Sequence, residues 1–173
     1  SIAGQHMEKL SEEQLVTFRR DHVGFIFQSF HLMGTLNAVE NVALPLSFRG
    51  VPRDIRMKKA DKMLDLVKLG KHKKHMPNQM SGGQQQRVGV ARALVVDPDI
   101  IFADEPTGNL GRANADEVLK LLLKTKEVMG QTLIMVTHDL SIADHADRIF
   151  RMENGVLSLE RDYVGGNKKT GQY

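Results

Sequence analysis

The sequence predicts an α/β domain built on a mainly parallel sheet, with an α-helical segment inserted into it. Short apolar runs form the expected strands, and each stops at a polar or charged residue: residues 23–27 before Gln28, 100–103 before Asp104, and 132–137 before His138. Continuous apolar runs are typical of strands buried on both faces of a parallel sheet. Helical stretches separate the runs, and such sheets bind ligands at the carboxyl ends of their strands.

The first half of the chain contains a short helix, a strand and a long helical region. Ser11 and Gln14 have the spacing of a capping box, which predicts a helix running to about Arg20. The strand of residues 23–27 follows. The region of residues 29–77 is Met-rich, and its apolar residues fall on one helical face: Met57, Ala60, Met63, Leu64 and Val67.

The second half alternates helices with strands. The turn of residues 81–83 precedes a helix that is expected to reach about Val96. Another helix is expected over residues 113–128, ended by Gly130 as its C-terminal cap. Asn154-Gly155 lies between two β-rich runs and predicts the turn of a hairpin.

These elements predict a division of the 173 residues into two domains. Residues 1–28 and 97–162 would form the sheet-based core, and residues 29–96 the helical subdomain. The Gly- and Lys-rich tail of residues 163–173 is expected to be disordered.

The composition excludes several classes of protein. The chain has no Cys, so it can form neither disulfides nor thiolate metal sites, which fits a reducing compartment. Aromatic residues make up 5% and Trp is absent, so a base-stacking surface is not expected. The net charge of +3 comes from interleaved charges and does not indicate a nucleic-acid partner. No apolar stretch approaches the roughly 18 residues of a membrane span, so direct membrane insertion is not expected.

Two adjacent acids carry the strongest local signal for chemistry. Asp104 and Glu105 end an apolar run and precede Pro106-Thr-Gly. Because side chains alternate along a strand, the two carboxylates are expected to point to different sides. One can then hold a hydrated Mg²⁺ while the other faces a water that attacks a phosphate.

The other strand ends place polar groups at the same edge of the sheet. His138 follows the run of residues 132–137, where a neutral imidazole can hydrogen-bond a γ-phosphate or the attacking water. Gln28 has the same placement, and its amide oxygen could complete an Mg²⁺ shell. An alternative metal set is less favoured, because its second pair would lie on a following helix: His138, Asp139, Asp144 and His145.

Two glycines, Gly82 and Gly83, stand before the helix that is expected to reach Val96. A helix start does not need them, because glycine costs conformational entropy. They are useful where a backbone approaches a ligand closely, and a helix N-terminus is a ready anion site. The alternative is a flexible linker before the helix.

Together these motifs resemble the nucleotide-binding domains of ABC transporters. SGGQQQRVGVARAL resembles the signature motif and its helix, with Met80 where the family usually has Leu. IIFADEP resembles Walker B with its catalytic glutamate, VTHD the switch-histidine loop, FIFQ the Q-loop and PTGNLG the D-loop. The segment GFIFQSFHLMGTLNAVENVALPL is similar to the group that serves lipoprotein release, macrolide or peptide efflux, and cell-division permeases.

The resemblance implies a P-loop NTPase core of the RecA type, in a subunit that binds and hydrolyses ATP with Mg²⁺ to power a membrane permease. Two such subunits would close head to tail as a homodimer, each capping the ATP of the other with its signature turn. The subunit would be cytoplasmic, held on the inner face of the plasma membrane by a transmembrane permease subunit.

The resemblance also implies a role for each site residue. The catalytic residues would be Glu105 and His138, and the Mg²⁺ ligands Gln28 and Asp104. The nucleotide-binding set would be Gln28, Ser81, Gly82, Gly83, Gln84, Asp104 and His138. The D-loop at the dimer contact would be Asn109, Leu110 and Gly111; the family usually has Asp at the last position, so weaker coupling between the two ATP sites is expected.

The sequence lacks the P-loop pattern G-x-x-x-x-G-K-[ST]. Gly70-Lys71 is followed by His72, and Lys169-Thr170 has Lys168 where a glycine is needed. The P-loop and the N-terminal strands of the family are therefore expected to precede Ser1. This polypeptide alone is expected to lack ordinary ATP affinity and ATPase activity, and apolar surface left uncovered by the gap would favour aggregation or strand exchange.

Two other functions compete with that of an ATPase subunit. One is a truncated, non-catalytic ABC module that only docks on a permease or a partner ATPase through its helical insert. The other is an ABC-type DNA-repair or chromosome ATPase, which is less favoured because no heptad run separates Gln28 from Ser81.

Overall fold

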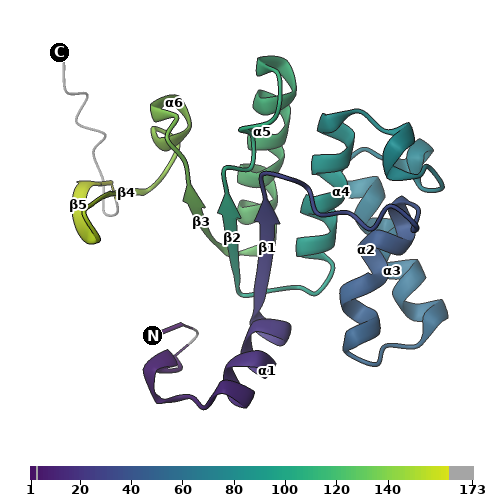
Figure 1. Cartoon of the computed structure of the whole chain (residues 1–173), viewed down its shortest axis with the longest axis horizontal. Helices are drawn as coiled ribbons and strands as arrows, with labels where there is room; N and C mark the ends of the chain where they lie inside the picture. Colours follow the sequence, from purple (N-terminus) through teal and green to yellow (C-terminus); the bar gives the residue numbers. More distant parts are fainter. Residues whose placement is uncertain (3, 164–173) are drawn as a thin grey trace. The chain divides into compact units, whose positions relative to one another are not determined.

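The computed structural model describes residues 1–2 and 4–163, which form parts of two compact units, Ser1–Val136 and Thr137–Tyr173. The first unit contains, in chain order, η1 (Met7–Lys9), α1 (Glu12–His22), β1 (Val23–Phe27), α2 (Ala38–Phe48), α3 (Arg53–Leu66), η2 (Gly70–His72), η3 (Pro77–Gln79), α4 (Gly82–Leu94), β2 (Ile100–Asp104), α5 (Arg112–Met129) and β3 (Thr132–Val136) (Figure 1). The second contains α6 (Leu140–Ala143), β4 (Arg148–Glu153) and β5 (Val156–Asp162).

The sheet of the first unit is parallel, as the apolar runs predicted. Its strand order is β1-β2-β3, and Phe27 pairs with Asp104, which pairs with Val136. The strands therefore end level with one another, and the residues that follow them emerge at one edge. This confirms the α/β class and the expected strands, with β2 running one residue further than predicted.

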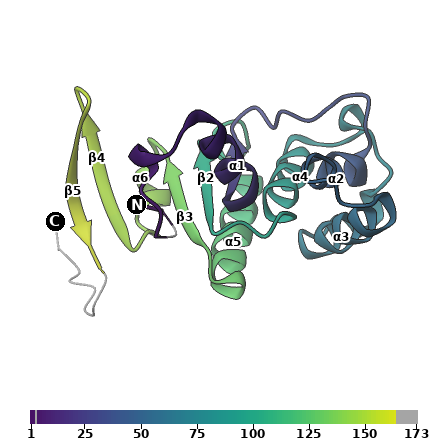
Figure 2. The same cartoon turned by 90° about the horizontal axis from the view of Figure 1, so that it is seen from below.

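One face of the sheet carries the hydrophobic core. Ile26, Ala103 and the partly buried Met135 share a register row and belong to one cluster with Val88 of α4 and Leu122 of α5. In Figures 1 and 2, α5 lies along the sheet and α4 lies beside it, next to α2 and α3. Helix α4 therefore connects the sheet with the helical region.

The helical region is stabilised by a helix cap and by the hydrogen bonds of one arginine. Asn37 forms a capping box with Glu40 at the start of α2, and the predicted face of α3 is buried at Ala60 and Leu64. Arg49, the C-cap of α2, donates hydrogen bonds to the backbone carbonyls of Arg20, Asp21 and Val96. The same buried cluster runs through this region and the sheet, and the boundary at residues 29–96 stays a prediction.

The other face of the sheet is aromatic and partly exposed. Phe25 pairs in register with Phe102, which pairs with Ile134, and the rings of Phe25 and Phe102 stack with centroids 5.8 Å apart. At the amino end of this layer, Phe18 of α1 packs with Val23 and Ile100.

The second unit contains the predicted hairpin. β4 and β5 pair antiparallel, and the turn residues Asn154 and Gly155 have φ of 49° and 78°, which is the left-handed region that Asn-Gly turns use. The predicted disordered tail falls, from residue 164 onward, outside the described residues. Within the described part of the chain, no helix has the length and apolar character needed to cross a membrane.

Candidate functional site

The ends of β1 and β2 bring three of the predicted site residues to one edge. Asp104 is the exposed last residue of β2, and its register partner Phe27 directly precedes Gln28. Glu105 lies beyond the strand in a left-handed conformation, with φ of 43°, and its N–H donates to the carbonyl of Val136. The prediction from strand alternation therefore does not apply to Glu105, because a turn sets the direction of its side chain.

The D-loop residues hold the side chain of Gln28. Its Nε2 donates to Oδ1 of Asn109 over 3.2 Å, and Nδ2 of Asn109 donates to the carbonyl of Gln28 over 3.1 Å. A Cβ added to Gly108 would lie 2.8 Å from Nε2 of Gln28, so the glycine makes room for this amide pair. The FIFQ and PTGNLG motifs therefore form one hydrogen-bonded group.

The donor set fits Mg²⁺. Carboxylate and amide oxygens are the ligands that hard divalent cations take in proteins, and Asp104 and Gln28 supply one of each at the same sheet edge. The bond from Nε2 of Gln28 to Asn109 uses the donor atom of the amide. The amide oxygen is the atom that a metal would require.

The signature turn begins α4 with a capping box. Oγ of Ser81 accepts from the N–H of Gln84, and Oε1 of Gln84 accepts from the N–H of Ser81. The first N–H groups of a helix have no partner within the helix, so this end of α4 is suited to an anion.

The second glycine has a structural reason as well. A Cβ on Gly83 would lie 2.9 Å from the side chain of Asn114 on α5, whereas one on Gly82 would meet Leu110 at an ordinary 3.5 Å. Gly83 therefore makes room for the side chain of Asn114 on α5, which would have to shift if a Cβ were added. This contact was not predicted, because a glycine pair before a helix does not indicate which distant side chain approaches it.

A strained loop follows Gln28 and is held by α4. Phe30 and His31 both have positive φ, at 54° and 47°, and Arg92 donates to both of their carbonyls. Burial lowers the pKa of the Arg92 guanidinium from its ordinary value. Sequence reasoning missed Arg92, because an arginine within a helix gives no sign of its partners in a distant loop.

His138 belongs to the second unit, and its role stays a prediction. Its neighbour Asp139 caps α6, where Oδ1 accepts from the N–H and the hydroxyl of Ser141 over 2.9 and 2.7 Å. These hydrogen bonds hold the pKa of Asp139 below its ordinary value. Asp144 pairs instead with Arg161, and the described residues contain no metal-type cluster of three or more His, Cys, Asp or Glu.

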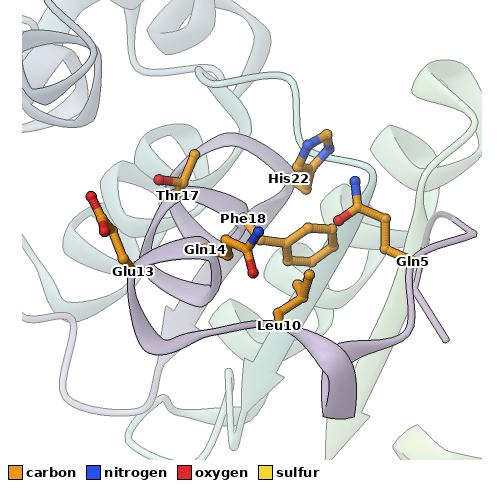
Figure 3. A pocket seen from close by; sticks show the side chains of 7 residues that line it. All are labelled: Gln5, Leu10, Glu13, Gln14, Thr17, Phe18 and His22. Carbon is orange, nitrogen blue, oxygen red and sulfur yellow. The ribbon is translucent and has the colours of Figure 1, made fainter.

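A groove of about 340 Å³ lies away from these motifs, at the amino end of β1. Figure 3 shows its lining, which comes from α1 and the segment before it: Gln5, Leu10, Glu13, Gln14, Thr17, Phe18 and His22. At its rim Nδ1 of His22 lies 2.6 Å from Oδ2 of Asp99. Because the site motifs follow the opposite ends of the strands, this groove is not part of the candidate site.

Solved structures of ATP-binding cassettes have this fold. The ATP-binding cassette MJ0796, in a dimeric post-hydrolysis state bound to ADP and Pi, matches with a TM-score of 0.82 at 39% identity, over 95% of this chain and 73% of that one. A second dimeric structure of MJ0796 matches with a TM-score of 0.80 at 40% identity, over 92% of this chain and 71% of that one.

Relatives identify the family. The chain is 48% identical to the uncharacterized ABC transporter ATP-binding protein YbbA of Escherichia coli K12, over 92% of this chain and 70% of YbbA. It is 47% identical to the macrolide export ATP-binding/permease protein MacB of Shewanella sp. ANA-3, over 96% of this chain but only 25% of MacB. The ABC transporter family model matches residues 1–108. The chain belongs to the ABC transporter family, as its motifs predicted.

Proposed function

We propose that the chain is part of an ATP-binding and ATP-hydrolysing subunit that powers a membrane permease. The observation that carries this proposal is the register of Phe27 with Asp104, which brings Gln28, Asp104 and Glu105 to one sheet edge. The family and the ADP-bound state of MJ0796 support a nucleotide as the ligand of that edge.

Each residue has a role that its position supports. Asp104 and Gln28 would hold Mg²⁺, which neutralises phosphate charge when bound. Glu105 would orient the attacking water and accept its proton. It directly follows Asp104, and its left-handed backbone conformation sets the direction of its side chain separately from the strand. His138 would hydrogen-bond the γ-phosphate from the segment after β3.

The signature turn would act on the nucleotide of a second subunit. The N-terminus of α4 combines helix-end N–H groups with the hydroxyl of Ser81, and groups of this kind strengthen when they meet a charged phosphate. Dimeric MJ0796 structures support a homodimer, and the permease named in MacB supports docking on a transmembrane partner. The subunit would then lie at the inner face of the membrane.

The direct test is Glu105→Gln in the full-length protein. We expect ATP hydrolysis to fall by on the order of 10²-fold or more, because the amide cannot accept a proton from water. ATP should then trap the dimer, which size-exclusion chromatography would detect. Glu127→Gln, at an exposed position of α5, is the matched control and should hydrolyse ATP normally. Unchanged turnover in Glu105→Gln would remove this residue from the mechanism.

The 173-residue polypeptide by itself provides a second test. Without the P-loop pattern it lacks the backbone cradle and the lysine that bind nucleotide phosphates. Calorimetry should therefore detect no micromolar binding of MgATP to this polypeptide. Binding of that strength would show that the strand-end groups suffice and would overturn the expectation.

A further inference from the structure

We propose that Gln86 is a positioning residue, which holds Gln28 and Glu105 at a set spacing from within the signature helix. Its Nε2 donates to the carbonyl of Pro106 over 2.6 Å and to the carbonyl of Phe27 over 3.2 Å. Phe27 directly precedes Gln28, and Pro106 directly follows Glu105. One carboxamide therefore joins the backbone beside a predicted metal ligand to the backbone beside the predicted catalytic acid.

The burial of Gln86 makes this contact rigid. Its side chain is 0% exposed, on the inner face of α4 between the ends of β1 and β2. Phe27 is the last residue of β1, and Pro106 lies two residues beyond the end of β2. Because Gln86 is buried, loss of its donor would remove a hydrogen bond from each of the two carbonyls, and a buried acceptor that loses its partner costs more than the hydrogen bond itself contributes.

The amide oxygen of Gln86 indicates that this position requires the Nε2 donor and not the oxygen. Oε1 of Gln86 is buried and has no hydrogen-bond partner among the described residues. A buried polar atom without a partner is destabilising, so an apolar side chain of the same size would relieve this cost. The carboxamide is therefore best explained by the bridge that its Nε2 makes.

The bridge joins the ATP-facing motifs to the signature turn. Gln86 lies on α4, the helix that begins at Gly82, and Arg92 of the same helix holds the carbonyls of Phe30 and His31 after Gln28. A displacement of α4 therefore moves Gln28 and the backbone after Glu105 together. This inference rests on the proposed function, because it assigns Gln86 to the spacing of that site.

The test is Gln86→Met in the full-length protein, with MgATP as the probe. Methionine keeps the length of the side chain but cannot donate. Misplacement of catalytic groups by about 1 Å costs on the order of 10²-fold in rate, so we expect kcat to fall by about that factor. The KM for ATP should stay within about twofold, because Gln86 contacts the backbone behind the site and not the nucleotide.

The chain contains a matched control for the loss of a buried amide. Gln131 is also buried and donates from Nε2 to the backbone carbonyl of Pro98, and its Oε1 has no hydrogen-bond partner within the described part of the chain. It lies at the amino ends of the strands, away from the site motifs. Gln131→Met should lower the thermal unfolding temperature much as Gln86→Met does, yet leave kcat unchanged. Equal losses of kcat in the two variants would overturn the proposal.

A third variant gives a signature that a purely structural role would not produce. In Gln86→Glu the introduced carboxyl can donate to Pro106 only while it is protonated, and burial raises its pKa above the ordinary value. The ratio of its kcat to that of the wild type should therefore fall as pH rises through that pKa. A ratio that does not change with pH would overturn the proposal. A wild-type protein that hydrolyses no ATP would instead overturn the proposed function.

Discussion

Gly111 is a position where one substitution tests both helix stability and the expected coupling between ATP sites. It is the N-cap of α5 and has no side chain to cap the helix, and an added Cβ would meet none of the described residues within 4 Å. Asp at this position would accept from the first-turn N–H groups and face the positive end of the helix dipole. Gly111→Asp should therefore stabilise the chain by about 0.3–1 kcal/mol, measured by urea unfolding.

The matched control is Gly111→Ala, which fills the same space without an acceptor and should not stabilise α5. In the full-length protein, Gly111→Asp should also strengthen the cooperativity of ATP hydrolysis, because it supplies the carboxylate that the family's D-loop usually carries. A variant that is more stable but no more cooperative would confine Gly111 to helix capping.

The chemistry of single residues could be predicted from the sequence where it depends on local order. Asp104 and Gln28 were placed at one edge because each follows an apolar strand, and the register confirms this placement. The strand alternation used for Glu105 does not apply, since this residue lies beyond the strand with a positive φ. Gln86 received no role, because a glutamine in a helix does not indicate which distant carbonyls it meets.

At the scale of elements, sequence analysis succeeded with helix ends and strands because their signals are local. The capping box of α1 and the Gly130 cap of α5 lie where the sequence predicted them. The hydrogen bonds between distant elements were not predicted. Arg49 lies at the end of α2 and reaches carbonyls at the ends of α1 and α4, contacts that only the folded chain brings together.

Arg49 should therefore contribute to the stability of the helical region. Arg49→Ala leaves its acceptor carbonyls without their charged donor, and hydrogen bonds to charged groups contribute about 1.5–3 kcal/mol. We expect a loss of that size in urea unfolding. Arg49→Lys should recover only part of it, because an ammonium lacks the planar fork of donors. The control is Arg20→Ala, which removes an exposed ion pair with Asp21 and should change stability little.

At the scale of the whole molecule, the two faces of the parallel sheet differ in how well they are covered. Helices α4 and α5 bury the face that carries Ile26 and Ala103, both 1% exposed. On the aromatic face, Phe25 is 40% exposed and Ile134 is 41% exposed. These residues lie on β1 and β3, which are the outer strands of the sheet. Contiguous apolar surface beside open strand edges promotes association between chains.

The 173-residue chain should therefore self-associate through this face. Sedimentation velocity at increasing protein concentration should show oligomers. The double variant Ile134→Thr with Val136→Thr should shift the chain toward the monomer, because it removes apolar surface from the face. Both positions keep a β-branched residue, which suits a strand. Val128→Thr makes the same chemical change on α5, at a residue 73% exposed against 59% for Val136, and should leave association as it was. Monomers at every concentration, or equal effects of the substitutions on the sheet and on α5, would contradict an interface at the aromatic face.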